Sequence, residues 1–301
     1  MYLRLKVYKK DIFMNRYPIY NINNFERNTF SEDLYVNSFQ EHFQKHGFIE
    51  NMHRHNFYLL VFFTGGYGVH TIDFDTFSVQ RGSLFVMQPG QMHTWSLSDD
   101  TDGYVVFCSK EVFNLYFQSK AIEDYAYFKS FKNVPDVLLS NVEIEKISFY
   151  FELMLLEYQS EMLYKKDKIL NLLDVVFIEI SRLSTIQKDN VKSNYGNKLK
   201  QFELVLEQNF KTEKAPSFYA DALSISLKHL NRITKEILNE TVTALIAQRV
   251  LLESKRYMVE GNLTTSQIAD LLGFSSASYF LKLFKKHTGQ TPKSFKNGLK
   301  D

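Results

Sequence analysis

Between about residues 50 and 110, apolar residues form short runs and alternations separated by turn-forming residues, a pattern that indicates β-strands. Phe57–Phe63 is the longest apolar run and is typical of a buried strand; it is followed by Gly65-Gly66. Further strands are predicted at Tyr67–Phe74, Phe77–Val79, Leu84–Met87 and Tyr104–Phe107. Several short strands at this spacing predict a small barrel or sandwich.

From residue 141 the apolar period changes to three and four residues, which indicates helices. One helix is expected over about 141–164 and a second over about 168–183. The two helices could pack within their own domain, or could form a dimer contact of the antiparallel helix-pair kind. Both interpretations stay open at this point. The polar segment 185–197 has no period and is predicted to be a linker.

The C-terminal third contains a two-fold recurrence of a short helix, a turn and a second helix. In the first copy, which begins at Phe218, Ser226 is placed to cap the second helix. In the second copy, which begins at Thr265, Gly273 lies at the turn and Ser276 is placed as the cap. One continuous helix, about 243–258, is expected to join two helix-turn-helix units.

The second helix of each unit presents a polar face suited to DNA. In the first unit, Lys228, Asn231, Arg232 and Lys235 follow the spacing i, i+3, i+4, i+7. Arginine can pair with guanine, asparagine with adenine, and lysine with phosphate or guanine. In the second unit Ser278, Lys282 and Lys285 are expected to face outward. Because few of these side chains read bases, we expect the second helix to contribute positioning more than sequence choice.

The charge distribution supports a nucleic-acid module at the C-terminal end. Residues 211–301 carry 14 basic and 8 acidic side chains, against 22 and 26 in residues 1–210. The single cysteine, Cys108, excludes an intramolecular disulfide and a multi-cysteine zinc site, and its apolar surroundings predict a buried side chain. No signal-peptide core or membrane-length apolar run is seen, so a cytoplasmic protein without membrane contact is expected.

The stretch from Tyr219 to Lys296 closely resembles the DNA-binding domain of bacterial AraC/XylS-type regulators, most specifically over Ile268–Pro292. The resemblance implies seven helices. It also places Lys228, Asn231 and Arg232 of the first recognition helix, and Ala277, Ser278 and Lys282 of the second, at DNA. Three positions depart from the family pattern, namely Asn239, Ser254 and Leu281. Asparagine tolerates the left-handed conformation, so the turn at Asn239 is expected to survive. Arg249 is expected to be structural.

The N-terminal half contains Gly47, His53 and His55, and later Gly82, Pro89-Gly90 and His93, a spacing that resembles the two cupin motifs. The resemblance supports a barrel over about residues 20–110. The glutamate ligand of metal-binding cupins is absent, so we expect no metal ion or other cofactor and interpret the histidines as hydrogen-bonded residues at a pocket mouth. The candidate effector-pocket residues are His53, His55, Tyr58, His70, His93, Trp95 and Tyr104.

These observations predict an α+β protein with a cupin-like β-barrel followed by two helices and an all-α domain with two helix-turn-helix units. The expected divisions are an effector domain (1–140), a helical pair for dimerisation (141–184), a linker (185–197) and a DNA-binding domain (198–301). The expected function is that of a homodimeric transcription factor, not an enzyme, with promoter DNA, a small-molecule effector and RNA polymerase as partners.

Two alternatives remain open at the level of the sequence. One is a metal-dependent cupin enzyme with an appended helical domain. The other is a nucleic-acid-binding protein without sequence preference, against which Asn231 and Ser278 argue mildly. The sequence does not determine the effector, the operator or the choice between activation and repression. It also leaves open whether His53, His55 and His93 bind an ion.

Overall fold

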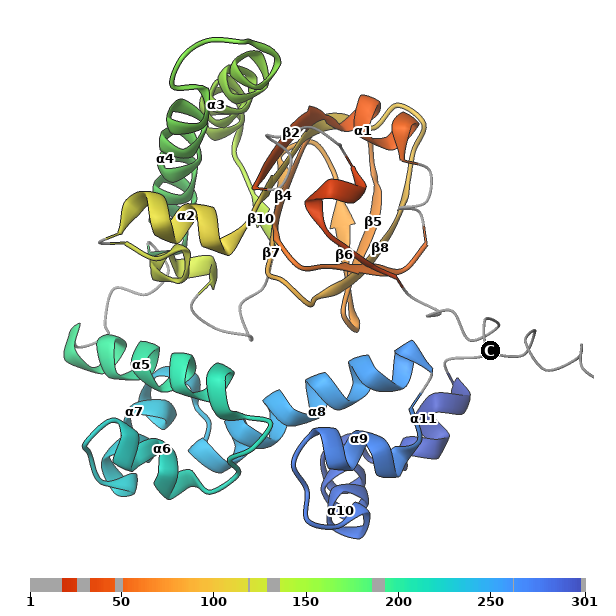
Figure 1. The fold of residues 1–301 in the computed structure, drawn as a ribbon, viewed down its shortest axis with the longest axis vertical. Helices are drawn as coiled ribbons and strands as arrows, with labels where there is room; N and C mark the ends of the chain where they lie inside the picture. Colours follow the sequence, from red (N-terminus) through yellow and green to blue (C-terminus); the bar gives the residue numbers. More distant parts are fainter. Residues whose placement is uncertain are drawn as a thin grey trace, which may run out of the picture. The chain divides into compact units, whose positions relative to one another are not determined.

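A computed structural model describes residues 18–25, 33–46, 51–118, 120–128, 136–185, 193–261 and 263–298. The chain divides into two compact units (Figure 1). The first, here called the β-rich unit, has its described residues between Pro18 and Thr185, and the second, the helical unit, between Ser193 and Gly298. The α+β class expected from the sequence is confirmed.

Ten strands of the β-rich unit form two five-stranded sheets, with the orders β1-β3-β8-β5-β6 and β10-β7-β4-β9-β2 among the described residues. All strand pairs are antiparallel except β1 with β3. The strands are β1 (Ile19–Tyr20), β2 (Leu34–Ser38), β3 (His53–His55), β4 (Tyr58–Gly65), β5 (Gly68–Ile72), β6 (Asp75–Val79), β7 (Ser83–Met87), β8 (Met92–Leu97), β9 (Asp102–Cys108) and β10 (Asp136–Leu138).

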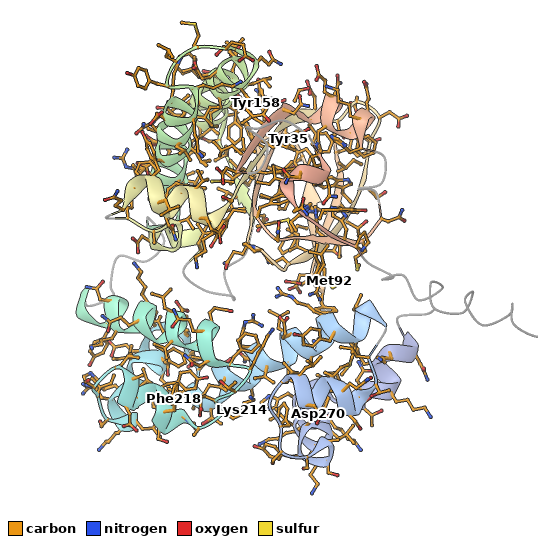
Figure 2. All side chains as sticks on the ribbon, viewed as in Figure 1. Tyr35, Met92, Tyr158, Lys214, Phe218 and Asp270 are labelled. Atoms are coloured by element: carbon orange, nitrogen blue, oxygen red, sulfur yellow. The ribbon has the colours of Figure 1, made fainter. Side chains whose placement is uncertain are left out.

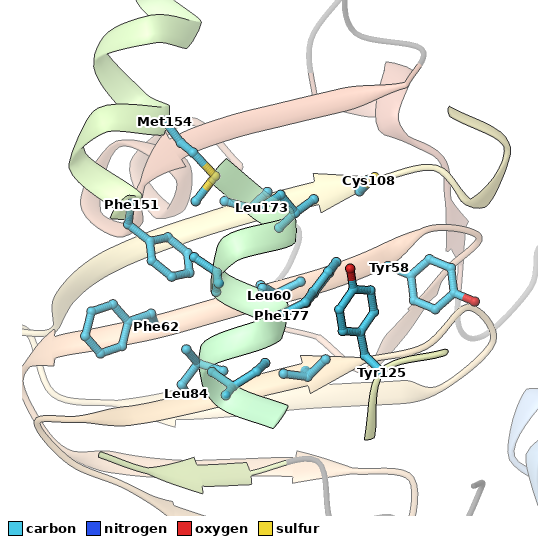
Figure 3. Close-up of a cluster of buried hydrophobic side chains, with 14 of the residues drawn as sticks. Tyr58, Leu60, Phe62, Leu84, Cys108, Tyr125, Phe151, Met154, Leu173 and Phe177 are labelled. Atoms are coloured by element: carbon cyan, nitrogen blue, oxygen red, sulfur yellow. The ribbon is translucent and has the colours of Figure 1, made fainter. Parts of the chain in front are cut away.

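Strand β4 is apolar from Leu59 to Phe63 because both of its faces are buried over this stretch. Leu59 and Val61 point into an interior that the two sheets share, together with Phe85 of β7 and Trp95 of β8. The alternate residues of β4, β7 and β9 point to the opposite face of their sheet and contact helices, and Figure 3 shows this second cluster around Phe177. The β-rich unit therefore has two hydrophobic cores, one on each face of the sheet that contains β4.

Helices α3 (Asn141–Gln159) and α4 (Lys165–Thr185) form the second of these cores with the sheet. They correspond to the helical pair expected from the sequence, although α3 ends five residues earlier than predicted. The side chain of Ser140 accepts from the Glu143 backbone N–H, and the Glu143 carboxylate accepts in return from the Ser140 N–H, so α3 begins with a capping box. Two further helices, α1 (Phe39–Lys45) and α2 (Lys110–Phe117), were not predicted.

The helical unit contains seven helices in its described residues, as the family resemblance implied. They are α5 (Ser193–Asn209), α6 (Pro216–Ala222), α7 (Leu227–Leu238), α8 (Val242–Glu260), α9 (Thr265–Leu271), α10 (Ala277–Thr288) and α11 (Pro292–Gly298). Helix α8 contacts α6 and α7 as well as α9, α10 and α11, and is the connection between the two helix-turn-helix units (Figure 1).

The two helix-turn-helix units repeat each other in detail. Helices α6 and α9 have seven residues each, and α7 and α10 have twelve each. Both turns pass through a left-handed residue, Ser224 (φ 53°) in the first and Gly273 (φ 69°) in the second. A Cβ atom at position 273 would lie 2.1 Å from the carbonyl oxygen of Lys211, so only glycine fits there.

One boundary differs from the sequence prediction. The expected linker covered residues 185–197, but Thr185 belongs to α4 and α5 already begins at Ser193. The remaining linker residues, 186–192, lie outside the described part of the chain. Polar composition alone predicted the linker, and the first turns of α5 are polar although Tyr195 and Lys198 within them contact His229 and Leu223. Within the described residues, no helix combines the length and the apolar character that a membrane crossing requires.

Candidate nucleic-acid interface and effector site

Helix α7 has one buried and one exposed face, as its apolar spacing predicts. The Ser226 hydroxyl accepts from the His229 backbone N–H at 3.2 Å, so the predicted cap is present. Leu230 and Ile233 are fully buried. At its other end α7 stops at the C-cap Asn239, which has a left-handed backbone (φ 55°). Glycine is the usual residue in this conformation at a helix end, and asparagine also tolerates it.

Three of the four predicted DNA-contacting residues of α7 are exposed, namely Lys228, Arg232 and Lys235. The Arg232 guanidinium lies 5.6 Å from the centre of the Tyr195 ring of α5. This cation–π contact holds the arginine at the surface, where its hydrogen-bond donors remain accessible. Helix α7 therefore presents one preoriented arginine between two lysines.

Asn231 lies differently from the prediction. Its side-chain Nδ2 donates to the Leu227 carbonyl oxygen, and its Oδ1 accepts from the Val242 backbone N–H, both at 3.1 Å. Val242 is the first residue of α8, whose N–H groups have no partner within their own helix. The Asn231 amide thus joins the recognition helix α7 to the start of α8, and this engagement favours a positioning role over adenine recognition.

Helix α10 repeats α7 with a shift of fifty residues, so Ser278, Leu281, Lys282 and Lys285 occupy the positions of Lys228, Asn231, Arg232 and Lys235. Ser276 caps the helix through the Tyr279 N–H at 3.3 Å. Ser278, Lys282 and Lys285 are exposed, whereas Ala277 is half-buried. His287 is exposed, whereas Phe280 and Phe284 of the same helix are fully buried.

Tyr279 is a candidate contact residue that the sequence analysis missed. It lies in the first turn of α10 with 55% of its surface exposed, beside Ser278 and three residues before Lys282. A large exposed aromatic side chain next to two predicted contact residues is the signal that could have identified it. Its ring also contacts Phe274 in the turn, with the centroids 5.7 Å apart.

The connecting helix α8 is fixed to α5 by Arg249, in agreement with the structural role expected for this residue. Its guanidinium donates to both carboxylate oxygens of Glu207, at 2.5 and 3.0 Å, and to Glu253 at 3.2 Å. The guanidinium carbon also lies 3.8 Å from the centre of the Phe210 ring. Figure 2 shows the side chains of this unit, with Lys214, Phe218 and Asp270 labelled.

In the β-rich unit, four histidines meet inside the space between the two sheets. The strand register pairs His53 of β3 with His93 of β8, and His70 of β5 with Trp95 of β8. Because side chains alternate along a strand, His55 shares the inward face of His53. All four imidazoles are at most 4% exposed, so they are buried core residues and do not line a pocket mouth as expected.

These four rings form a continuous chain of contacts. His53 Nδ1 donates to the Asn51 carbonyl oxygen at 2.6 Å. His53 Nε2 lies 3.1 Å from His55 Nε2, which lies 2.7 Å from His93 Nε2. His93 Nδ1 lies 2.9 Å from His70 Nε2. The cluster thus joins three strands of one sheet.

Burial keeps the four histidines neutral. It lowers the pKa of His53 to about 4, against a weak opposing effect of its bond to Asn51, and lowers the pKa of His70 to about 3. It also holds the pKa values of His55 and His93 well below the usual range, and the neighbouring histidines act in the same direction. Neutral imidazoles offer lone pairs that can accept a hydrogen bond or bind a metal ion.

The structure separates the seven predicted effector-pocket residues into two groups. Trp95 belongs with the histidines, since its ring centroid lies 5.0 Å from that of His93. Tyr58 and Tyr104 do not, because the alternation of β4 and β9 turns them toward the helices, where they contact Phe128 and Phe151. The structure therefore does not bring these two tyrosines together with the histidines. Cys108 is also on that side, fully buried, and burial raises the pKa of its thiol.

Two family models match the chain, one in each unit. Residues 36–146 match the AraC-like ligand binding domain, and residues 219–298 match a helix-turn-helix domain. The chain belongs to the AraC-type regulators. The second match begins within α6 and covers the rest of both helix-turn-helix units, and the first covers all of the histidine cluster.

The AraC-type chain is also similar to individual proteins over part of its length. It is 34% identical over 91 residues to the bifunctional transcriptional activator/DNA repair enzyme AdaA of Bacillus subtilis, covering 30% of the chain and 43% of AdaA. It is 32% identical over 92 residues to the transcriptional activator CfaD of Escherichia coli, covering 30% of the chain and 34% of CfaD. The chain thus spans less than half the length of these two relatives.

Among solved structures, ToxT from Vibrio cholerae is similar over 88% of this AraC-type chain and 98% of its own, with 14% identity and a TM-score of 0.43.

Proposed function

We propose that this protein is a sequence-specific DNA-binding transcription factor whose β-rich unit binds a small effector. The observation that carries the proposal is the repeated pair of capped recognition helices, α7 and α10, whose exposed positions recur with a shift of fifty residues. The AraC-like ligand binding match supports an effector, which would act by changing the population of DNA-binding states.

The length of α8 suits two contacts on one duplex. Its 19 residues span roughly 28 Å, and successive major-groove segments on one side of B-DNA lie about 34 Å apart. With the width of the units added, α7 and α10 can reach adjacent groove segments. We assign base contacts to Arg232 and Lys228, and phosphate or groove-edge contacts to Lys235, Ser278, Lys282 and Lys285. Ala277 and Tyr279 complete the proposed surface, and Asn231 positions α7.

The substitution Arg232→Ala tests the role of α7. We expect specific DNA affinity to fall by roughly 1–3 kcal/mol and base preference to relax at one position, because a bidentate arginine contact is lost. Lys45→Ala, which removes the same charge from an exposed site in the β-rich unit, is the matched control and should leave both unchanged. A mobility-shift series on randomised operators that gives the same affinity and preference for Arg232→Ala as for the unaltered protein would show that α7 does not read bases.

A homodimer through α3 is the second part of the proposal. Val142, Phe149 and Leu156 recur every seven residues on α3 and remain 57–76% exposed, whereas the other apolar residues of the helix are buried or half-buried. These three residues occupy a single heptad position and form a narrow exposed apolar stripe along α3, which a second copy of the helix could cover. The same helix packs its opposite face on the sheet, so intradomain packing and dimerisation use different faces of α3.

We therefore expect Phe149→Glu to weaken self-association at least a hundredfold, because a charge replaces the central apolar residue of the stripe. Leu115→Glu is the control, since Leu115 is 75% exposed on α2 outside the stripe. Sedimentation velocity over a concentration series measures both. A monomer for the unaltered protein, or an unchanged dimer for Phe149→Glu, contradicts this assignment.

The remaining roles follow from regulator function and are inferred with it. A regulator of this type would act at promoters, with RNA polymerase as a partner, in the cytoplasm where the DNA is. We infer no catalytic role for this chain. The relative AdaA is a DNA repair enzyme as well as an activator, so an assay for DNA repair activity on the purified protein would test that inference directly.

A further inference from the structure

We propose that the β-rich unit binds one divalent transition-metal ion through His53, His55 and His93. These residues place three imidazole nitrogens within 4.8 Å of one another, and all three side chains are buried. The proposal concerns the β-rich unit alone and does not depend on DNA binding by the helical unit.

The histidine cluster has too few protons to satisfy all of its ring contacts. A carbonyl oxygen can only accept, so the bond to Asn51 places the proton of neutral His53 on Nδ1 and leaves a lone pair on Nε2. His55 Nε2 faces this lone pair at 3.1 Å and His93 Nε2 at 2.7 Å. If His55 Nε2 carries a proton, that proton can make a linear hydrogen bond either to His53 Nε2 or to His93 Nε2, but not to both. If His55 Nε2 carries no proton, its lone pair faces the lone pair of His53 Nε2. One of the two contacts is therefore unsatisfied in each arrangement of protons.

The environment of the cluster also favours a cation. His55 Nδ1, His70 Nδ1 and Trp95 Nε1 are buried without a hydrogen-bond partner in the described part of the chain. Phe57 and Phe107 flank His55, with ring centroids 4.5 and 5.8 Å from it. Buried polar groups normally find partners. Trp95 Nε1 can only donate, but each neutral imidazole of the cluster keeps one nitrogen lone pair, and buried lone pairs that lack a donor are suited to a cation.

The geometry of the cluster is close to that of a metal site. Nitrogens bound at about 2.0–2.1 Å to one tetrahedral zinc ion lie roughly 3.3–3.4 Å apart. The observed separations of 3.1 and 2.7 Å would have to open by roughly 0.2–0.7 Å to admit the ion. The remaining pair, His53 and His93, lies within 4.8 Å and would have to reach the same spacing. Two of the three ligands are already oriented from behind, His53 by the Asn51 carbonyl and His93 by His70 Nε2. Such outer contacts are the usual way in which ligating histidines are held.

The donor set defines the class of ion. Three imidazoles without a carboxylate suit zinc, cobalt, nickel or copper, whereas magnesium and calcium require oxygen ligands. The absence of a carboxylate, which the sequence analysis took as evidence against a hard-metal site, is thus compatible with a borderline ion. A fourth coordination position would remain for water or a small ligand.

Cobalt(II) is the probe, because its visible absorption reports coordination and it quenches nearby fluorescence. The full-length protein, stripped with chelator, should bind one cobalt ion per chain, quench the emission of Trp95, release the cobalt to zinc and ignore magnesium. His53→Gln and His93→Gln should each weaken binding at least a hundredfold, and His287→Gln, at an exposed histidine of α10, should not change it. Absence of stoichiometric binding, or binding that survives both cluster substitutions, overturns the proposal.

X-ray absorption on the cobalt complex of the unaltered protein tests the number of histidine ligands even if the variants do not fold. The scattering pattern of imidazole shells should account for three histidines. Fewer than three would overturn the assignment. DNA binding is measured separately on the same sample, so that a failure of the proposed regulatory function and a failure of the metal site give different results.

Discussion

Acidification from pH 7 to pH 5 will destabilise the β-rich unit of the metal-free protein by about 4 kcal/mol through His53 and His70 alone, about 2 kcal/mol for each. Their pKa values are lowered by burial to about 4 and about 3, from 6.5 in the unfolded chain. Between pH 6.5 and 4 the unfolded state therefore binds more protons than the folded state, so the free energy of unfolding falls as the pH falls. The buried His42, His55 and His93 act in the same direction.

The measurement can be confined to the β-rich unit because Trp95, the only tryptophan of the chain, lies inside it. Urea unfolding followed by tryptophan emission at pH 7, 6 and 5 gives the slope of the free energy of unfolding against pH. His70→Gln is expected to reduce the slope by the share of one histidine. Identical unfolding midpoints at pH 7 and pH 5 would mean that the histidines are protonated or solvated in the folded protein.

Arg249→Ala is expected to cost the helical unit about 2–4 kcal/mol of stability. Breaking a buried ion pair typically costs about 3–5 kcal/mol, and the value here is discounted because the Glu207 side chain is 44% exposed. The substitution removes both bonds to Glu207 and the contact with the Phe210 ring, which together hold α8 on α5.

Chemical denaturation followed by circular dichroism at 222 nm measures this loss. Arg182→Ala is the comparison, because Arg182 pairs with Glu179 on the surface and is 68% exposed, so a change below about 1 kcal/mol is expected. If Arg249→Ala and Arg182→Ala had equal effects, the apolar contacts of α8, and not the Arg249 ion pairs, would account for its attachment to α5.

The parts of the fold that the sequence predicted are those with a strong local signal. The caps Ser226 and Ser276, the left-handed Gly273 and the apolar face of α7 are local features, and the structure confirms each of them. Strand β4 was predicted because both of its faces are apolar. Strands β3 and β8 were not predicted individually, since their inward faces carry histidines, which have no strong preference for strands.

The candidate sites were harder to predict because they depend on contacts between distant residues. Nothing in the sequence near Asn231 indicates that its amide accepts from Val242 eleven residues later. Likewise, side chains alternate along a strand between the face toward the sheet interior and the face toward the helices. The sequence alone did not show on which face Tyr58 and Tyr104 lie. The burial of His53 and His93 follows from the pairing of β3 with β8, which is a property of the sheet.

The fifty-residue recurrence between α7 and α10 also has an evolutionary meaning. The two helices have the same length and a serine N-cap each, whereas the exposed Lys228 and Arg232 of α7 correspond to Ser278 and Lys282 of α10. The scaffold is thus the same in both copies while the proposed reading surface differs. On the proposed function, the operator half bound by α7 would have a strict base sequence, whereas the half bound by α10 would accept several sequences. New target promoters could then arise by mutation in the half bound by α10.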